Sequence, residues 1–567
     1  MEKRWELKKP GDKTQVKNLS EKLGIDDVTA NLLVQRGVKN YDEAKYFFRP
    51  QLSFLHPPFL MKDMDKAISR IETAIVKKEN ILIYGDYDVD GTTAVALVYT
   101  FFKKIISHID YYIPDRYSEG YGISFSAIDF AEKNNFSLII ALDCGIKAND
   151  KIDYANKKKI DFIICDHHRP GNEIPNAVAV LDPKRSDCNY PFDELSGCGI
   201  GFKLIQAYAE KNNFLESDLL PYLDLVAISI AADIVPIVGE NRILAHFGLK
   251  QLNASPRAGI KAILQLNNVK KEISITEIVF IISPRINAAG RMESGNKAVE
   301  LLISEGEEIA LNSGRNINIT NTERKNLDTL ITRQALDMIE EDAEMMQRKT
   351  TVLFHPEWHK GVIGIVASRL IEKYYRPTVI LTESSGKATG SVRSVKDFDV
   401  YNAIEKCSDL LEQFGGHKYA AGLTLKLENV KIFSDRFEKI VSESIEEKLL
   451  TPEIEIDAAI NLEAITPKFF RLINQFAPFG PQNMAPIFTT KNVMCAGNPS
   501  IVGTTHLKFN VADNDSPKNN FSVIAFNMAH KISEISEKKS FDICYSIEEN
   551  EWNGNVSLQL VIKDIRA

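Results

Sequence analysis

The chain has 567 residues, of which 44% are hydrophobic and 26% are charged, as in a globular protein large enough for several domains. The net charge of -8 argues against a uniformly basic nucleic-acid-binding protein, although a local basic channel is compatible with it. The seven cysteines form no CxxC pair, which argues against a zinc cage or a disulfide framework. The N-terminus lacks the apolar core of a signal peptide, and no apolar run reaches the roughly 20 residues of a membrane span, so we expect a cytoplasmic protein.

The first half of the chain predicts a helical segment and then an α/β domain. Residues 1–61 are mixed in character, with small helices expected between Lys22 and Phe48. From Lys62, apolar strands alternate with helical patterns, and residues 195–300 are mostly helical. Alternation of this kind is typical of a parallel sheet, so we expect an α/β domain over 62–304. Its expected strands are Ile81–Tyr84, Ile109–Ile113, Leu138–Leu142, Phe162–Cys165 and Val178–Leu181.

The second half predicts three further parts. Residues 305–349 are polar and helical, as expected of a long connecting helix. Residues 350–450 return to an α/β pattern, with strands at Thr351–Phe354 and Thr378–Leu381 and a helix at Val362–Tyr375 between them. Residues 451–567 contain short strand-like runs separated by polar turns, which predicts a C-terminal β-barrel.

Three alternating aspartates end the first expected strand. Asp86, Asp88 and Asp90 follow Ile81–Tyr84 and precede a helix expected over Ala94–Ile105. In an extended segment, side chains at i and i+2 share a face. Carboxylates grouped in this way repel one another unless a cation lies between them, and hard divalent cations prefer oxygen ligands. The stretch predicts a metal site, although a single aspartate at a strand end is more often a turn or a helix cap.

Further polar side chains end the later elements. They are Asp143, Asp166, His167, His168 and Asp233. Because the carboxyl ends of parallel strands meet at one edge of a sheet, we expect these side chains to converge. Carboxylates with an imidazole suit Mn²⁺ or Mg²⁺, and a bridging carboxylate allows two ions ~3.5–4 Å apart, an arrangement that cleaves phosphoesters. The pattern therefore predicts a metal-dependent phosphoesterase.

Motifs along nearly the whole chain point to a family. In the first domain they are Asp86-Tyr-Asp-Val-Asp-Gly91, Leu142-Asp-Cys-Gly145, Asp166-His-His168, Ile113-Pro-Asp-Arg-Tyr-Ser-Glu-Gly-Tyr-Gly122, Ala232-Asp-Ile-Val-Pro236 and Ser283-Pro-Arg-Ile-Asn-Ala-Ala-Gly-Arg291. In the second they are His355-Pro-Glu-Trp-His-Lys-Gly-Val-Ile-Gly364, Gly390-Ser-Val-Arg-Ser394 and Gly415-Gly-His-Lys-Tyr-Ala-Ala-Gly422. The chain resembles the DHH phosphoesterase superfamily, and within it the RecJ branch of single-strand-specific 5′→3′ DNA exonucleases. The resemblance implies a parallel-sheet DHH domain, a DHHA1 domain and a C-terminal OB-fold.

The resemblance also implies a two-metal centre. Its metal ligands would be Asp88, Asp90, Asp143, His167 and Asp233. Asp143 would bridge the two ions, and His168 would complete the catalytic set beside the scissile phosphate. Asp86 and Asp166 would support the ligands from behind. Small-substrate members of the superfamily usually carry a histidine where this chain has Tyr84, so we expect the protein to hold the first ion less fully.

Contacts to the DNA strand are expected from both α/β domains. Arg116 lies in a loop beyond the second expected strand, and Arg285 lies in the Ser283 motif; arginine offers a fork for phosphate oxygens. Ser391 and Arg393 lie in an expected glycine-led turn, which by resemblance holds the 5′-terminal phosphate. His417 ends a Gly-Gly-His stretch that predicts either an anion-binding turn or a tight strand–helix connection.

In the barrel, an aromatic side chain beside a basic groove can stack on a base. Trp552, in the polar stretch Glu551–Gly554, is the expected stacking residue, whereas Phe509 and Phe521 are expected in the barrel core.

The function implied by the resemblance is release of 5′-mononucleotides from single-stranded DNA in recombination and repair. Single-strand-binding protein and a helicase would be partners. Two alternatives stay open: a DHH phosphodiesterase acting on oligoribonucleotides or cyclic dinucleotides, and a non-catalytic single-strand-binding scaffold. The barrel and Tyr84 argue against the first, and the intact ligand set argues against the second.

Overall fold

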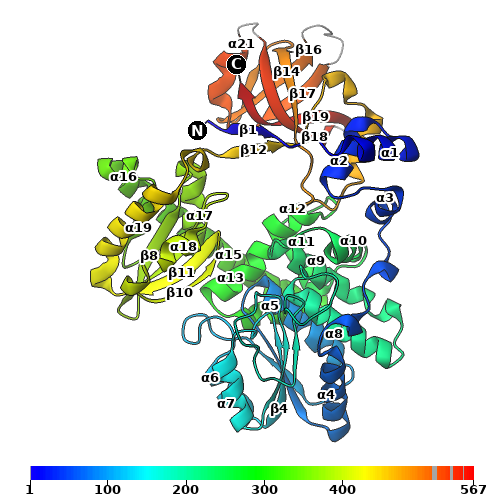
Figure 1. Ribbon diagram of the computed structural model, residues 1–567, viewed down its shortest axis with the longest axis vertical. Helices are drawn as coiled ribbons and strands as arrows, with labels where there is room; N and C mark the ends of the chain where they lie inside the picture. Colours follow the sequence, from blue (N-terminus) through cyan, green and yellow to red (C-terminus); the bar gives the residue numbers. More distant parts are fainter. Residues whose placement is uncertain (1, 514–519, 537–539, 553, 567) are drawn as a thin grey trace. The chain divides into compact units, whose positions relative to one another are not determined.

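The structure, a computed structural model, describes residues 2–513, 520–536, 540–552 and 554–566 (Figure 1). The chain forms two compact units. The first unit comprises Arg49–Lys325 and Pro478–Met484; the second comprises Met1–Phe48, Asn326–Ala477 and Ala485–Ala567. Among the described residues, no helix combines the length and the apolar character that crossing a membrane requires.

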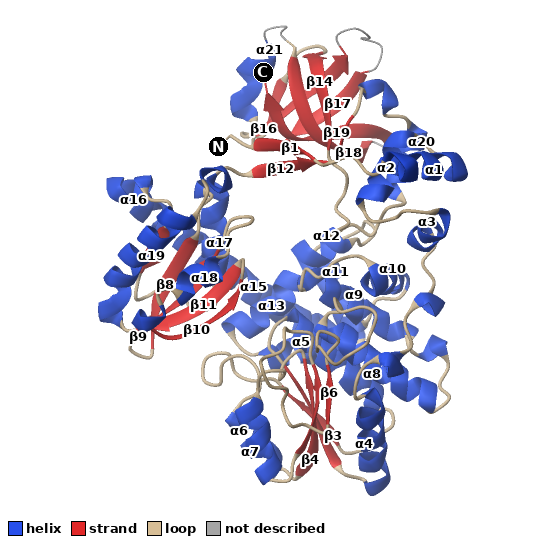
Figure 2. Ribbon diagram, in the orientation of Figure 1, coloured by secondary structure: helices blue, strands red, loops and turns tan. Residues whose placement is uncertain are grey.

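The first unit is built on a five-stranded parallel sheet with the order β3-β2-β4-β5-β6. The strands are β2 (Asn80–Gly85), β3 (Ile109–Tyr112), β4 (Phe136–Leu142), β5 (Asp161–Cys165) and β6 (Ala179–Leu181). Alternate residues of β2 enter opposite cores, because Ile81 and Ile83 pack on one face and Leu82 and Tyr84 on the other. Helices cover both faces (Figure 2), which explains why the strands read as continuous apolar runs.

The helices on the Ile81 face include α4 (Met64–Lys77), α5 (Val89–Phe102) and α8 (Gly197–Lys211). Those on the other face are α6 (Phe125–Lys133) and α7 (Asn149–Lys157). The chain then continues through α9 (Leu223–Ala232), α10 (Gly239–Ala254), α11 (Ala258–Leu266), α12 (Ile275–Glu277), the π-helix η5 (Ile278–Ile282), α13 (Ser283–Met292) and α14 (Gly295–Ile303). A long helix, α15 (Glu307–Glu341), follows, and the division between the units falls within it.

The second unit contains a mixed sheet with the order β10-β11-β9-β8-β7. Its strands are β7 (Thr351–Phe354), β8 (Thr378–Ser384), β9 (Lys387–Arg393), β10 (Leu411–His417) and β11 (Ala420–Leu425). Only β7 and β8 run parallel in it. The associated helices are α16 (Ala343–Gln347), α17 (Ile363–Tyr374), α18 (Val400–Glu405) and α19 (Val430–Ser444).

A closed β-structure forms the tail, as expected for an OB-fold. Its strand order is β13-β14-β18-β19-β17-β16-β15, and an extra pairing of β14 with β16 closes it. The strands are β13 (Ala458–Ala459), β14 (Phe488–Cys495), β15 (Ser500–Val502), β16 (His506–Asp513), β17 (Asn520–Ala525), β18 (Phe541–Trp552) and β19 (Asn555–Arg566), with helices α20 (Pro467–Asn474) and α21 (Ile532–Ser536). Phe509 is buried in its core, as predicted, and Phe521 is half-buried.

The N-terminal segment is not purely helical. Helices α1 (Lys13–Leu23), α2 (Asp27–Gln35) and α3 (Tyr41–Phe48) follow a strand, β1 (Arg4–Leu7), which pairs in parallel with β12 (Glu453–Ile456). The Trp5 indole also donates to the Asp564 carboxylate over 2.8 Å. The small helices expected between Lys22 and Phe48 are present, but β1 was not predicted, because a four-residue strand stabilised by so distant a partner leaves no local pattern.

Candidate metal centre

The first aspartates lie between the end of β2 and the first turn of α5, where the backbone turns sharply and is not extended. Asp88 is the N-cap of α5, and its carboxylate accepts a hydrogen bond of 3.1 Å from the Gly91 amide. Asp90 therefore lies in the first helical turn, whereas Asp86 is fully buried behind it. A Cβ on Gly91 would stand 2.4 Å from the Asp86 carbonyl oxygen, so only glycine permits this turn. The expectation that all three carboxylates share one face of an extended strand is wrong.

The N-terminus of α8 holds the Asp90 carboxylate. Its Oδ2 accepts from the Gly197 amide at 2.7 Å, and its Oδ1 accepts from the Cys198 amide at 2.8 Å. The unpaired amides and the dipole of a helix N-terminus favour an anion at this place. Sequence reasoning assigned no role to these residues, although the glycine-rich run Ser196–Gly201 was the available signal.

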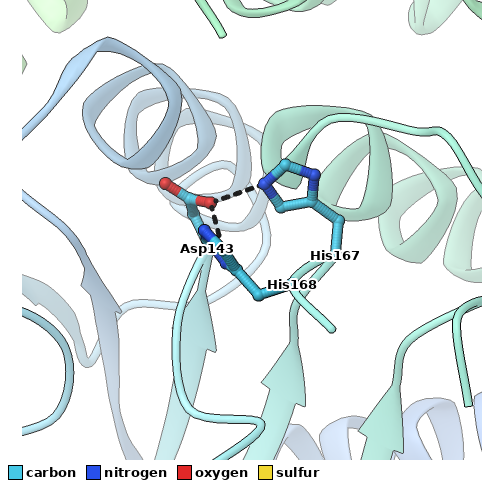
Figure 3. A group of neighbouring side chains, drawn as sticks. All are labelled: Asp143, His167 and His168. Carbon is cyan, nitrogen blue, oxygen red and sulfur yellow. Dashed lines mark ion pairs between the residues drawn. The ribbon is translucent and has the colours of Figure 1, made fainter. Parts of the chain in front are cut away.

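Asp143 and the two histidines form the centre of the site (Figure 3). Asp143 Oδ1 lies 3.2 Å from His167 Nε2 and 3.9 Å from His168 Nδ1. His167 Nε2 is also 3.6 Å from a carboxylate oxygen of Asp90 and 3.6 Å from one of Asp233, the C-cap of α9. Asp143, His167 and His168 form one candidate metal-binding group, and Asp90, His167 and Asp233 form another. The ends of β4, β5 and α9 and the start of α5 thus converge, as the sequence predicted for these residues.

The electrostatics of this cluster fit a bound cation. Among the described residues, Asp143 Oδ1 and both ring nitrogens of His167 are buried without a hydrogen-bond partner. Burial, followed by the charges of Asp90 and Asp88, holds the pKa of Asp143 well above its usual range. Burial lowers the pKa of His167 to about 4, which keeps the imidazole neutral and able to bind a metal. Carboxylates and a neutral imidazole without partners are costly to bury, and they are ligands suited to Mn²⁺ or Mg²⁺.

Asp166 orients His168 instead of facing the cluster. Its oxygens accept from the amides of Ile146, His167 and His168 and from His168 Nδ1, at 2.8–3.1 Å. Burial lowers the pKa of His168, but the hydrogen bond and charge of Asp166 outweigh it and raise this pKa to about 9. His168 Nε2 lies 3.2 Å from the hydroxyl of Tyr121, a residue of the Ile113 motif to which the sequence gave no role. The imidazole is therefore fixed at both nitrogens.

Tyr84, in the place of the superfamily histidine, is an anchor for the neighbouring loop. Its hydroxyl donates to the Gly122 carbonyl at 2.6 Å, and its ring stacks on Tyr112 with centroids 5.8 Å apart. The anchored loop carries Arg116, whose guanidinium lies over the Tyr87 ring at 4.9 Å from the centroid. Arg116 is thereby placed beside the β2–α5 turn, in the loop that follows β3.

The Arg285 guanidinium is engaged inside the first unit. Its side chain is buried, Nε donates to Asn318 Oδ1 at 2.6 Å, Nη1 donates to the Ile281 carbonyl at 2.6 Å, and Nη2 donates to Asn267. These donors tie α13 to α15 and to the end of α11, which argues for a structural role, and the phosphate contact stays a prediction. A motif position alone does not distinguish a buried structural arginine from an exposed one.

We expect replacement of Arg285 by methionine to reduce stability more than substrate affinity. Loss of the guanidinium leaves the Asn267 and Asn318 oxygens without a charged donor and costs about 2–4 kcal/mol. Thermal melts would show the loss, while the KM for a single-stranded oligonucleotide, measured below the melt, should stay within about twofold of wild type. A KM raised tenfold at an unchanged melting temperature would return Arg285 to the substrate site.

The predicted residues of the second unit lie together on its mixed sheet. Ser391 and Arg393 are in β9, not in a turn, and His417 ends β10, which contradicts both alternatives for the Gly-Gly-His stretch. Register places His417 opposite Ala420 and Ala420 opposite Arg393, so these side chains share one face. A Cβ on Gly364, in the first turn of α17, would stand 2.8 Å from Ser391 Oγ and 3.1 Å from Arg393 Nη2. The stretch led by Gly390 looked like a turn because glycine permits a bend as well as a close approach, and here a Cβ on Gly390 would stand 2.5 Å from Leu381 Cδ2.

Trp552 is the last residue of β18, and its side chain lies outside the described part of the structure.

Comparisons with known proteins cover most of the chain. Family models of the DHH family N-terminal domain, the DHHA1 domain and the RecJ OB domain match residues 80–230, 347–443 and 456–564. The single-stranded-DNA-specific exonuclease RecJ of Bacillus subtilis is 36% identical over 99% of this chain and 70% of its own length. The Escherichia coli RecJ is 30% identical over 94% of this chain and 95% of its own length. The crystal structure of Thermus thermophilus RecJ in complex with Mn²⁺ matches with a TM-score of 0.85 and 26% identity, covering 100% of this chain and 79% of that one. On these identities and coverages, the chain belongs to the RecJ family.

Proposed function

We propose that this protein is a metal-dependent, single-stranded-DNA-specific 5′→3′ exonuclease that releases 5′-mononucleotides in DNA recombination and repair. The observation that carries the proposal is the close approach of Asp143 Oδ1 and His167 Nε2 at the edge of the parallel sheet. They lie 3.2 Å apart, and both are buried without a hydrogen-bond partner among the described residues. RecJ relatives are named single-stranded-DNA-specific exonucleases, and a Mn²⁺ complex and a Mg²⁺ complex of the Thermus protein have been solved.

The proposed site holds two Mn²⁺ or Mg²⁺ ions. Its ligands are Asp88, Asp90, Asp143, His167 and Asp233. Ions bound there supply an acidified water and positive charge for the developing transition state. Asp166 holds the His168 ring through Nδ1, which keeps that imidazole beside the site of cleavage. Arg116, stacked on Tyr87, offers its guanidinium edge to a phosphate of the strand.

Each part of the chain has a proposed task. Residues 62–304 carry out the hydrolysis, and residues 305–349 connect this domain to the next. Residues 350–450 bind the 5′ end of the strand through Ser391, Arg393 and His417. Residues 451–567 bind the strand further along, with Trp552 stacking on a base. The 1–61 segment contributes β1, which supports the β12 strand before the barrel. Single-strand-binding protein and a helicase are proposed partners, because a single-strand exonuclease needs duplex to be opened and strands to be presented.

One digestion experiment tests the function. We would incubate the full chain with 5′- or 3′-labelled single and double strands, with 5′-phosphate or 5′-hydroxyl ends, in Mn²⁺, Mg²⁺ or EDTA. Single strands labelled at the 5′ end should release labelled mononucleotide from the start of the reaction, and strands labelled at the 3′ end should release it late. Neither substrate should be cleaved in EDTA. Faster hydrolysis of cyclic dinucleotides or short oligoribonucleotides would favour a small-substrate phosphodiesterase. Strand binding without released nucleotides would favour a scaffold.

A further inference from the structure

Two buried serines stand behind the Asp90 carboxylate, and neither belongs to the metal-ligand set. Ser196 is the N-cap of α8, and Ser229 lies in the last turn of α9; both are fully buried. The Ser229 hydroxyl is 2.6 Å from Asp90 Oδ1 and 2.6 Å from Ser196 Oγ. Ser196 Oγ in turn accepts from the Gly199 amide at 3.2 Å.

The direction of this hydrogen-bond chain follows from proton counting. An ionised carboxylate only accepts, so the single Ser229 proton goes to Asp90 Oδ1. Ser196 Oγ accepts from the Gly199 amide and lies 2.6 Å from Ser229 Oγ, so it holds the donating hydroxyl from the other side. The contacts run from the α8 amide through two hydroxyl oxygens to the carboxylate.

The result is an asymmetric carboxylate. Asp90 Oδ1 accepts from both the Cys198 amide and the Ser229 hydroxyl, whereas Oδ2, within the described part of the chain, accepts only from the Gly197 amide. Oδ2 is also the oxygen that lies 3.6 Å from His167 Nε2. Asp90 Oδ2 is therefore the oxygen available to a cation, whereas Oδ1 is held by the Cys198 amide and the Ser229 hydroxyl.

Ser229 also links Asp90 to Asp233. The Asp233 amide donates to the Ser229 carbonyl at 2.9 Å in the last turn of α9. A serine within a helix commonly bonds a carbonyl of its own helix, but this hydroxyl reaches across to α5 and α8. The Ser229 hydroxyl thus ties Asp90 of α5 to α9, the helix whose C-cap is Asp233.

We propose that Ser229, assisted by Ser196, is a positioning residue that makes Asp90 a one-oxygen metal ligand and fixes its place relative to Asp233. The inference rests on the proposed metal-dependent function, but it concerns metal affinity and can be measured without DNA. Groups that orient metal ligands in this way typically change metal affinity about 10–100-fold when removed.

The test measures Mn²⁺ binding to the full-length protein by the electron paramagnetic resonance signal of free Mn²⁺. Ser229→Ala should weaken the binding about tenfold. Ser196→Ala should weaken it less, and the double variant should be no weaker than Ser229→Ala, because Ser196 acts through Ser229. In nuclease assays, Ser229→Ala should need about tenfold more Mn²⁺ for half-maximal rate, with kcat at saturating Mn²⁺ within about twofold of wild type.

The matched control is Ser283→Ala, which removes another buried hydroxyl of the first unit, at the start of α13. It should leave Mn²⁺ binding unchanged. Wild-type affinity in Ser229→Ala, additive losses in the double variant, or an equal loss in Ser283→Ala would each overturn the proposal. If Ser229→Ala does not fold, Mn²⁺ binding by Ser196→Ala tests the proposal instead. A wild-type Mn²⁺ affinity in Ser196→Ala would then refute the role of the two serines. Failure of the nuclease function itself would appear as tight Mn²⁺ binding by the wild type without DNA cleavage.

Discussion

Asp143→Asn should abolish DNA cleavage and leave the affinity for single strands nearly unchanged. Asp143 Oδ1 is buried without a hydrogen-bond partner and is the oxygen nearest to His167 Nε2, so it is the group that most needs a cation. The neutral amide removes that charge. Its loss should slow cleavage by at least about 10²–10³-fold, as for other preorganised charged groups in active sites. Asparagine is the right replacement because Asp143 has a φ of 60°, a left-handed conformation that asparagine tolerates and alanine does not.

The measurements are nucleotide release in Mn²⁺ and fluorescence anisotropy of a labelled single strand. Asp182→Asn is the matched control, since Asp182 is a buried aspartate that follows β6, two strands from β4 in the sheet, and accepts from the Lys184 amide. It should retain cleavage. Wild-type turnover in Asp143→Asn would remove Asp143 from the metal centre, and equal loss of strand binding would show that its role is structural.

Gly197→Ala should cause the second largest loss, through a single methyl group. A Cβ at this position would stand 2.6 Å from Asp143 Cβ and 2.7 Å from Asp143 Oδ1. The start of α8 would have to move away, and the Gly197 amide that holds Asp90 Oδ2 at 2.7 Å would move with it. Both ligands would be displaced, so we expect Mn²⁺ affinity to fall by about 100-fold and cleavage to become undetectable at millimolar Mn²⁺.

The control for this variant is Gly201→Ala, one turn later in α8. Its Cβ would stand 3.2 Å from Val98 Cγ2, an apolar contact that a small side-chain shift relieves. Circular dichroism should show both variants folded, and only Gly197→Ala should lose Mn²⁺ binding. Normal Mn²⁺ binding by a folded Gly197→Ala protein would show that the approach of α8 to Asp143 is not required.

The sequence predicted those features that local patterns encode. Continuous apolar runs predicted the parallel sheet, and polar residues after them predicted the convergence of Asp143, His167 and Asp233. It did not predict that α5 begins at Val89, because Asp88 serves as an N-cap and a ligand candidate at once. Spacing alone does not separate these two uses of an aspartate.

Contacts between distant segments were the other features that the sequence did not reveal. The bonds from Arg285 to Asn267 and Asn318 were not predicted. The Ser196–Ser229 pair gave no signal, since each serine alone is a common helix residue. These arrangements depend on which elements pack together, and one sequence contains no direct record of that.

The pairing of β1 with β12 also determines how long β1 waits for its partner during synthesis. Arg4 and Glu453, which face each other across this pair and form an ion pair, are 449 positions apart in sequence. At synthesis rates of about 5–20 residues per second, the first strand waits roughly 20–90 s for its partner. The parallel sheet of the first unit is complete in sequence by Leu181, long before then. The β1 strand is therefore without its partner until Ile456 has been synthesised, and its edge is open to other chains during that interval.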